Sequence, residues 1–287
     1  MAQKVFLNNE LVDVEKAAIS VADSGLLYGA GLFETMRSRN GVVFRVEDHL
    51  DRLFFSAAAL SIDHSFDKPC LLSALDRVLE ANDLKDARLR LTLTNGPLAE
   101  SEDQRRPTLL ITATEFRPYP SDYYNTGVLV VLCPFRQNPT DPTCGHKTTN
   151  YYPRLLALNL AHRRRAAEAL WFATDNRLAE GCISNVFLVK DSVLYTPSVQ
   201  TPVLPGIARK TVLQVAKEQS IEAVEKDLYI ADLLGADEVF LTNIVMEVLP
   251  VTHIEQHAVG NGNVGSVTQR LRESFVVAVE QECGRQP

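Results

Sequence analysis

The strictest alternation of hydrophobic and polar positions lies in residues 87–94, with the sequence ARLRLTLT. The leucines at every second position share one face, while Arg88, Arg90 and two threonines occupy the other. A period of two predicts a β-strand with one face in the core and one polar face. Asn95-Gly96-Pro97 follows at once and predicts the turn that ends this strand.

A helical period replaces this alternation in residues 46–60. Apolar residues recur there at intervals of three and four, from Leu50 to Leu60, as expected for an amphipathic helix. Similar patterns predict helices over residues 71–79, 154–167 and 207–218.

Short apolar or alternating segments predict the remaining strands, and several follow turn signals such as Asn8-Asn9 and Asn40-Gly41. They cover residues 4–7, 11–12, 30–37, 42–44, 108–114, 127–133, 169–173, 186–189, 193–195 and 239–242. Strands and helices on both sides of a Pro-containing stretch predict an α+β fold in two domains. We place a small N-terminal α/β domain at 1–117, an interdomain linker at 118–125, and a larger C-terminal domain at 126–287.

Composition says more about the functional class of the protein than about its fold. The chain has 287 residues, 46% hydrophobic and 23% charged, as in a globular protein with a substantial core. A net charge of -7 argues against nucleic acid or an anionic membrane as a partner. Five scattered cysteines without a C-x-x-C pair argue against a disulfide framework and a metal site. With neither a signal peptide nor an apolar run of 18 residues, we expect a reduced, cytoplasmic protein.

Two charged residues stand in settings that suggest chemistry. Lys147 lies in a turn-rich segment of the predicted larger domain, residues 144–152 (CGHKTTNYY), just before a predicted helix. An imine-forming lysine must be available as a neutral amine, whereas most loop lysines are solvated charges. Glu180 stands alone in a small, mostly apolar segment. A carboxylate there needs a cationic partner, which is either an arginine or a protonated ring nitrogen.

Two turns and one arginine are candidates for binding an anion such as phosphate. Residues 204–209 (LPGIAR) lead into a predicted helix, whose first N–H groups and dipole attract negative charge. Residues 242–244 (TNI) end a predicted strand and offer further donors, although both segments also fit ordinary turns. Arg52 lies beside the apolar stripe of its helix, where it either pairs with Asp48 on the surface or clamps a phosphate.

The order of these motifs resembles the class IV aminotransferases, also called the fold type IV pyridoxal-phosphate enzymes. That family includes branched-chain aminotransferases, D-amino-acid aminotransferases and aminodeoxychorismate lyases. The resemblance extends over nearly the whole chain. It rests on residues 28–35 (YGAGLFET), 49–53 (HLDRL), 146–151 (HKTTNY), 179–187 (AEGCISNVF), 204–207 (LPGI), and 242–243 (TN) with 247–251 (EVLPV).

The resemblance implies a fold, a cofactor and a role for each motif. Family members have a small N-terminal α/β domain and a larger barrel-like C-terminal domain, with the site between them, and are at least homodimeric. Lys147 would hold pyridoxal 5'-phosphate as an internal aldimine and shuttle a proton, Glu180 would face the pyridine nitrogen, and Tyr151 would bind O3′. The remaining implied residues are Arg52, Gly206, Ile207, Ala208, Asn243 and Ile244 for the phosphate end, and Tyr28, Phe33, Arg88 and Arg90 for the substrate pocket.

Three departures from the family pattern bear on the reaction. Ala208 replaces a threonine of many relatives, so one side-chain contact to phosphate is expected to be missing. Residues 243–245 (NIV) stand where branched-chain aminotransferases carry Gly-Thr-Ala, and the asparagine is like that of aminodeoxychorismate lyases. The Arg-x-His pair of D-amino-acid aminotransferases is not evident. Arg88 and Arg90 occupy the corresponding strand, where a solvated strand face is the alternative.

We therefore expect an aminotransferase that moves an amino group between an amino acid and a 2-oxo acid through Lys147. The alternative is an aminodeoxychorismate lyase, which makes p-aminobenzoate and pyruvate. A non-catalytic binding protein is a remote third interpretation. Such a protein would be expected to have lost Lys147 or Glu180, and this chain keeps both.

Overall fold

The computed structural model describes residues 3–62, 65–98 and 106–284, which form two compact units. The first unit comprises Met1–Arg117, His146–Tyr151 and Val279–Pro287, and the second comprises Pro118–Gly145 and Tyr152–Ala278. The segment with Lys147 thus groups with the first unit. The domain limits proposed from the sequence stay predictions.

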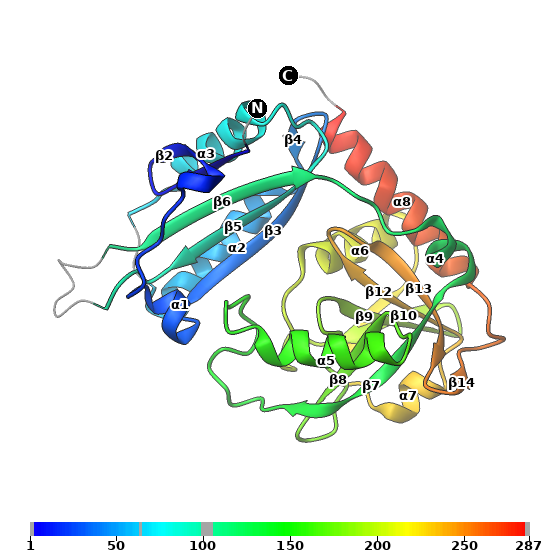
Figure 1. The fold of residues 1–287 in the computed structure, drawn as a ribbon. Helices are drawn as coiled ribbons and strands as arrows, with labels where there is room; N and C mark the ends of the chain where they lie inside the picture. Colours follow the sequence, from blue (N-terminus) through cyan, green and yellow to red (C-terminus); the bar gives the residue numbers. More distant parts are fainter. Residues whose placement is uncertain (1–2, 63–64, 99–105, 285–287) are drawn as a thin grey trace. The chain divides into compact units, whose positions relative to one another are not determined.

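An antiparallel sheet with the strand order β2-β1-β6-β5-β3-β4 forms the first unit. Its strands are β1 (Lys4–Leu7), β2 (Glu10–Asp13), β3 (Gly31–Arg39), β4 (Val42–Val43), β5 (Ala87–Thr94) and β6 (Thr108–Glu115). Helices α2 (Val46–Ala59) and α3 (Lys68–Ala81) cover one face of this sheet, as Figure 1 shows. Two short elements, η1 (Val14–Lys16) and α1 (Ser24–Tyr28), precede β3.

The alternation in β5 decides which side chains face these helices. Leu89, Leu91 and Leu93 are buried in the core that α2 and α3 share with the sheet, which confirms the predicted strand and its apolar face. The register pairs Arg90 with Thr35 and places those side chains on the opposite face. One face of the sheet therefore builds the core, and the other is left for polar and aromatic residues.

A second, curled sheet forms the other unit, with the strand order β11-β10-β9-β12-β13-β7-β8 and β14 paired to β13. Its strands are β7 (Val128–Gln137), β8 (Glu168–Ala173), β9 (Asn185–Lys190), β10 (Val193–Pro197), β11 (Ala223–Lys226), β12 (Glu238–Asn243), β13 (Glu247–Ile254) and β14 (His257–Ala258). The backbone N–H of Leu178 donates to the Leu228 carbonyl at 2.7 Å. This hydrogen bond joins segments that follow the two edge strands, so the sheet closes toward a barrel (Figure 1).

The helices of the second unit are α4 (Ser121–Thr126), α5 (Tyr152–Arg163), α6 (Ile207–Glu218), α7 (Ile230–Leu234) and α8 (Ser266–Cys283), whose last residues belong to the first unit. Helix α6 has the predicted limits. Helix α5 ends short of the predicted residue 167, because Arg165 adopts a left-handed φ of 59°. Within the described ranges, none of the helices is long and apolar enough to cross a membrane.

Candidate active site

The segment that carries Lys147 pairs with the beginning of β3 in the first unit. Phe33 donates its N–H to the Lys147 carbonyl at 2.9 Å, and Thr149 donates to the Gly31 carbonyl at 2.8 Å. Strand β4 pairs only with the far end of β3, so this stretch of β3 has an edge that the lysine segment occupies. A β-carbon at Gly31 would lie 2.8 Å from the Leu93 carbonyl oxygen, so glycine is required at this close approach.

Aromatic rings surround the amine of Lys147 within this unit. Its Nζ lies 4.6 Å from the centre of the Phe33 ring and 5.7 Å from that of Tyr151. The two rings meet edge to face, with centroids 5.2 Å apart. Aromatic faces hold a cationic or polar head while presenting apolar walls. Three residues singled out from the sequence are therefore brought together here.

Arg90 joins the same group, whereas Arg88 and Tyr28 do not. The guanidinium carbon of Arg90 lies 3.9 Å from the centre of the Phe33 ring, and Nε donates to Thr92 at 3.3 Å. Burial lowers the pKa of Arg90, and the neighbouring charge of Arg88 lowers it further. Arg88 and Tyr28 are exposed, the latter on α1. The solvated strand face suggested by the sequence thus describes Arg88 but not Arg90.

A buried ionic cluster lies on the helix side of the same sheet. Glu34 points toward α2 because it alternates with Phe33 along β3. Arg52 donates from Nε and Nη2 to the two Glu34 oxygens at 2.8 and 2.5 Å, and His49 Nδ1 lies 2.7 Å from Glu34 Oε2. Burial raises the pKa of Glu34, but the charge of Arg52 and the hydrogen bond with His49 outweigh it, so the pKa falls to about 2.

This cluster changes the interpretation of Arg52. Two guanidinium nitrogens of Arg52 bind the buried Glu34, and Asp48 pairs with Arg45. The phosphate role of Arg52 stays a proposal. Sequence reasoning assigned no role to Glu34 or His49. The available signal was the spacing of His49 and Arg52, three residues apart on one helical face, together with a glutamate inside an otherwise apolar strand.

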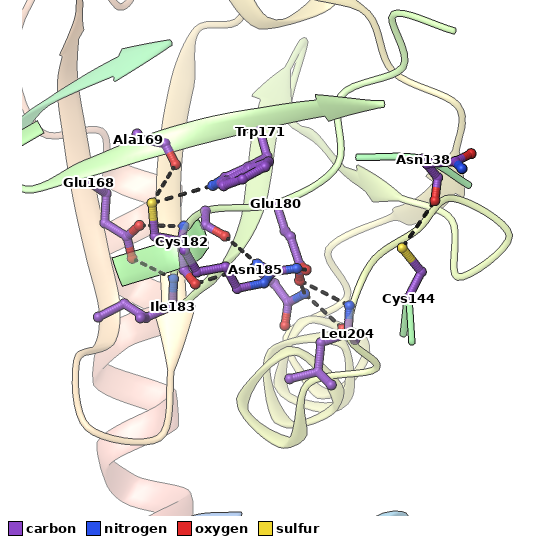
Figure 2. A network of polar contacts seen from close by, with 12 residues as sticks. Asn138, Cys144, Glu168, Ala169, Trp171, Glu180, Cys182, Ile183, Asn185 and Leu204 are labelled. Atoms are coloured by element: carbon purple, nitrogen blue, oxygen red, sulfur yellow. Dashed lines mark hydrogen bonds and ion pairs between the residues drawn. The ribbon is translucent and has the colours of Figure 1, made fainter. Parts of the chain in front are cut away.

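Glu180 has its own set of donors in the second unit, of which Figure 2 shows Asn185 and Leu204. Its Oε1 accepts from Arg154 Nη2 at 2.5 Å, and its Oε2 accepts from the Leu204 N–H at 2.9 Å and from Asn185 Nδ2 at 3.3 Å. The Glu180 side chain is buried. Arginine is thus a cationic partner, as one of the two alternatives predicted. A carboxylate offers about four acceptor sites, so three donors leave capacity for another.

The beginning of α6 lacks a side-chain cap among the described residues. Gly206 is the N-cap residue. The first backbone hydrogen bond of the helix runs from the Lys210 N–H to the Gly206 carbonyl at 2.9 Å. The N–H groups of the buried residues Ile207 and Ala208 precede it and have no acceptor within the helix. Asn185 Nδ2 holds the preceding Leu204 carbonyl at 2.9 Å. Ala208 brings no side-chain donor to this turn.

The turn after β12 is organised by the side chain of Asn243. Its Oδ1 accepts from the N–H groups of Val245 and Met246, both at 2.9 Å, and its Nδ2 donates to the Ile183 carbonyl at 3.0 Å. The Asn243 side chain therefore shapes the turn. Within the described contacts, the N–H of Ile244 has no acceptor and could donate to an anion.

These groups match the chemical needs of pyridoxal phosphate. An aldehyde requires an amine, which Lys147 has; the pyridine N–H requires an acceptor, for which Glu180 has capacity. The phosphate requires donors, and the buried N–H groups of Ile207 and Ala208 have no acceptor in the described part of the chain. The residues present therefore fit the cofactor that the sequence implied.

The family model for amino-transferase class IV matches residues 31–254 of the chain. A Methanocaldococcus jannaschii protein, provisionally named a branched-chain-amino-acid aminotransferase, is 37% identical over 95% of each chain. A D-alanine aminotransferase of Listeria monocytogenes is 31% identical over 98% of each chain. An aminodeoxychorismate lyase of Bacillus subtilis is also 31% identical, over 98% of this chain and 97% of its own.

Solved structures agree with these relatives. The Escherichia coli branched-chain amino acid aminotransferase superposes with a TM-score of 0.92 and 29% identity, covering 98% of this chain and 96% of its own. The branched-chain aminotransferase of Thermoproteus uzoniensis, solved with norvaline, gives a TM-score of 0.89 and 28% identity, covering 98% of this chain and 96% of its own. The chain therefore belongs to the class IV aminotransferases, a family of fold type IV enzymes that depend on pyridoxal 5'-phosphate.

Proposed function

We propose that the protein transfers an amino group between an amino acid and a 2-oxo acid, with Lys147 as its catalytic residue. The observation that carries this proposal is the setting of Lys147. Its main chain is fixed on β3, while its amine lies against Phe33 and Tyr151 and on the same sheet face as Arg90. A backbone held by a sheet with a mobile four-carbon side chain suits a lysine that must both bind a group and move a proton.

Lys147, Tyr151 and Glu180 have separate tasks in this proposal. The bound cofactor supplies an aldehyde that condenses with amines and a pyridine ring that withdraws electrons from them. Lys147 Nζ takes the proton from the substrate carbon and returns it, Tyr151 positions the ring oxygen, and Glu180 keeps the proton on the ring nitrogen. Arg154 and Asn185 hold the Glu180 carboxylate in place for that task.

The phosphate end of the cofactor has donors of two kinds. Backbone N–H groups of Ile207, Ala208 and Ile244 bind the anion, and Gly206 and Asn243 shape the turns that present them. Arg52, which is paired with Glu34, is the side-chain donor that the family resemblance assigns to the phosphate. These assignments extend the family resemblance residue by residue. Their support is the pair of buried N–H groups at the beginning of α6, which precede the first hydrogen bond of the helix, and the turn that Asn243 holds.

The substrate end of the proposal uses the face of β5 that carries Arg90. A guanidinium stacked on an aromatic ring is held in one orientation and suits a bidentate contact with a carboxylate. Phe33 contributes an apolar wall beside it. Tyr28 and Arg88 remain predicted pocket residues, and both are exposed in the single chain.

A half-reaction tests the proposal. Cofactor-loaded protein is mixed with an amino acid but without an acceptor, and visible absorption and released 2-oxo acid are recorded for D- and L-amino acids. We expect the absorption to shift and about one equivalent of 2-oxo acid to form, while Lys147→Ala gives neither. No shift with any amino acid of either hand would exclude aminotransferase activity.

The second candidate function is an aminodeoxychorismate lyase. It is favoured by the Bacillus subtilis relative of that name and by Asn243, which resembles the lyases. Release of p-aminobenzoate and pyruvate from aminodeoxychorismate, without the half-reaction above, would establish this function. A non-catalytic binding protein is the third alternative. It would load with cofactor and carry out neither reaction.

We also propose that the protein forms a homodimer. Val21, Leu26, Leu27 and Tyr28 are more than half exposed and adjoin along one short stretch of the first unit. Apolar side chains gathered in this way commonly mark an interface. Light scattering after size exclusion gives the mass in solution, and a monomer would exclude the proposal. The cytoplasmic location stays a prediction.

A further inference from the structure

A second buried carboxylate of the second unit binds the segment that follows Glu180 in the chain. Glu168, on β8, is 1% exposed and extends into the turn formed by residues 181–184. It accepts from the Cys182 N–H at 2.6 Å, the Ile183 N–H at 3.3 Å and the Ser184 hydroxyl at 3.0 Å, as Figure 2 shows in part. One carboxylate thus gathers three consecutive donors of the turn.

Other side chains hold the carbonyl groups of the same turn. Arg154 Nη1 donates to the carbonyls of Gly181 and Cys182 at 3.1 and 3.4 Å, and Asn243 Nδ2 donates to that of Ile183 at 3.0 Å. A β-carbon at Gly181 would collide with the Glu168 carboxylate and the Ser184 hydroxyl. Glu168 therefore binds the donors of this turn, and Arg154 and Asn243 bind its carbonyl groups.

This turn connects Glu180, the residue proposed to face the pyridine nitrogen, with Asn185, which binds the Glu180 carboxylate. Glu180 precedes it and Asn185 follows it, so a shift of the turn moves both ends of the Glu180 hydrogen-bond set. The amide of Asn243 also shapes the turn that presents the Ile244 N–H. The groups proposed for the pyridine nitrogen and for the phosphate thus belong to one connected polar frame.

We propose that Glu168 is a positioning residue, which fixes the turn at 181–184 so that Glu180 and the Asn243 turn stay at the spacing the cofactor requires. The inference rests on the proposed roles of Glu180 and Ile244. The carboxyl group of Glu168 suits this task because its two oxygens accept hydrogen bonds, and all three neighbours donate. A glutamine of the same shape turns an NH2 group toward one of those donors and loses at least one hydrogen bond.

The burial of Glu168 supports a specific role over general stabilisation. Burial raises the pKa of Glu168 to about 7, although Ser184 and the turn N–H groups oppose the rise. The charge of Arg154 also faces it and lowers the pKa, while the neighbouring Cys182 thiol is itself buried. Ionised Glu168 lowers the stability of the fold, yet it meets three aligned donors. We explain its presence by the turn at 181–184 that it positions.

Glu238 provides a matched control. It also accepts from two backbone N–H groups and a hydroxyl, those of Val267 and Thr268, at 3.1, 2.7 and 2.7 Å. Glu168→Gln and Glu238→Gln therefore remove the same kind of contact, one beside the Glu180 turn and one at the beginning of α8. Two measurements are made on each: cofactor affinity by absorbance titration, and amide hydrogen exchange in the cofactor-free protein.

We expect Glu168→Gln to weaken cofactor binding about tenfold, equivalent to about 1.4 kcal/mol, and to speed exchange at Cys182 and Ile183. Glu238→Gln should leave the cofactor affinity unchanged and speed exchange only at Val267 and Thr268. Equal losses of affinity in both variants would show a general structural effect and overturn the inference. Unchanged affinity and exchange in Glu168→Gln would also overturn it.

Two further outcomes are informative. If wild-type protein does not bind the cofactor, the proposed function fails, whereas faster exchange at Cys182 in Glu168→Gln still shows that Glu168 holds the turn. If Glu168→Gln does not fold, Ser184→Ala decides, because it deletes one donor and keeps the carboxylate. About threefold weaker binding with faster exchange at Cys182 supports the inference, and no change in either measurement overturns it.

Discussion

Glu34→Gln removes one negative charge from the buried cluster of Glu34, His49 and Arg52 while keeping the shape of the side chain. In the wild type, both Glu34 oxygens are bound by Arg52, and His49 adds a third contact. The variant leaves the guanidinium of a buried arginine opposite a neutral amide. Removing one partner of a buried ion pair is far more costly than never having had the pair.

The pKa of Glu34 sets the size of the expected effect. It falls from 4.5 to about 2 on folding, and each pKa unit corresponds to about 1.4 kcal/mol. The ionised carboxylate therefore contributes about 3 kcal/mol to the free energy of unfolding at pH 7. Because folding lowers this pKa, the contribution is present above pH 4.5 and is lost as the pH falls toward 2.

Urea unfolding followed by circular dichroism measures this contribution at pH 7 and pH 3. We expect the free energy of unfolding of the wild type to exceed that of Glu34→Gln by about 3 kcal/mol at pH 7. At pH 3 this difference should be smaller by about 2 kcal/mol. Glu47→Gln is the control, because its carboxylate pairs with Lys68 on the surface and should contribute little. A difference that stays the same at both pH values would refute the assignment of the effect to the Glu34 charge.

Three further predictions concern the site. Arg90→Gln should raise the KM of the carboxylate substrate about tenfold with cofactor absorption unchanged, whereas Arg88→Gln should raise it less than about twofold in the same steady-state assay. Glu180→Gln should bind the cofactor but react about a hundredfold more slowly in single-turnover absorbance measurements, because the ring nitrogen loses an anionic acceptor; an unchanged rate would contradict that role. The pKa of Glu168, raised to about 7, makes its contribution to stability greatest below pH 4.5 and lost as the pH rises through 7. The stability of the wild type relative to Glu168→Gln should therefore fall by about 2 kcal/mol between pH 5 and pH 8 in urea unfolding.

Local periodicity predicted the elements whose apolar positions are regularly spaced. The limits of β5 and α6 agree with the predicted residues 87–94 and 207–218. Elements with a weaker pattern were not predicted, among them β13, which contains Pro250 and His253, and the C-terminal α8. Their formation depends on neighbouring strands and on burial, which consecutive residues do not encode.

The ordered motifs were enough to identify the family and the cofactor, while the assignment of Lys147 as the attachment point stays a proposal. Glu180 was recognised as a carboxylate that needs a cation, and the structure supplies Arg154 in that place. The sequence could not reveal that Arg154 also binds the turn after Glu180, nor that Glu168 holds the same turn from β8. Those contacts join segments that are separate in the chain and depend on how the second sheet curls.

Lys147 shows most clearly which properties follow from the sequence and which from the tertiary structure. The sequence by itself determined that this lysine stands in the family motif, because the motif is a run of neighbouring residues. Only the tertiary structure decided that its backbone pairs with β3 and that its amine meets Phe33 and Tyr151. The physical reason is the register of the first sheet, which leaves part of the β3 edge free and sends Phe33 and Glu34 to opposite faces.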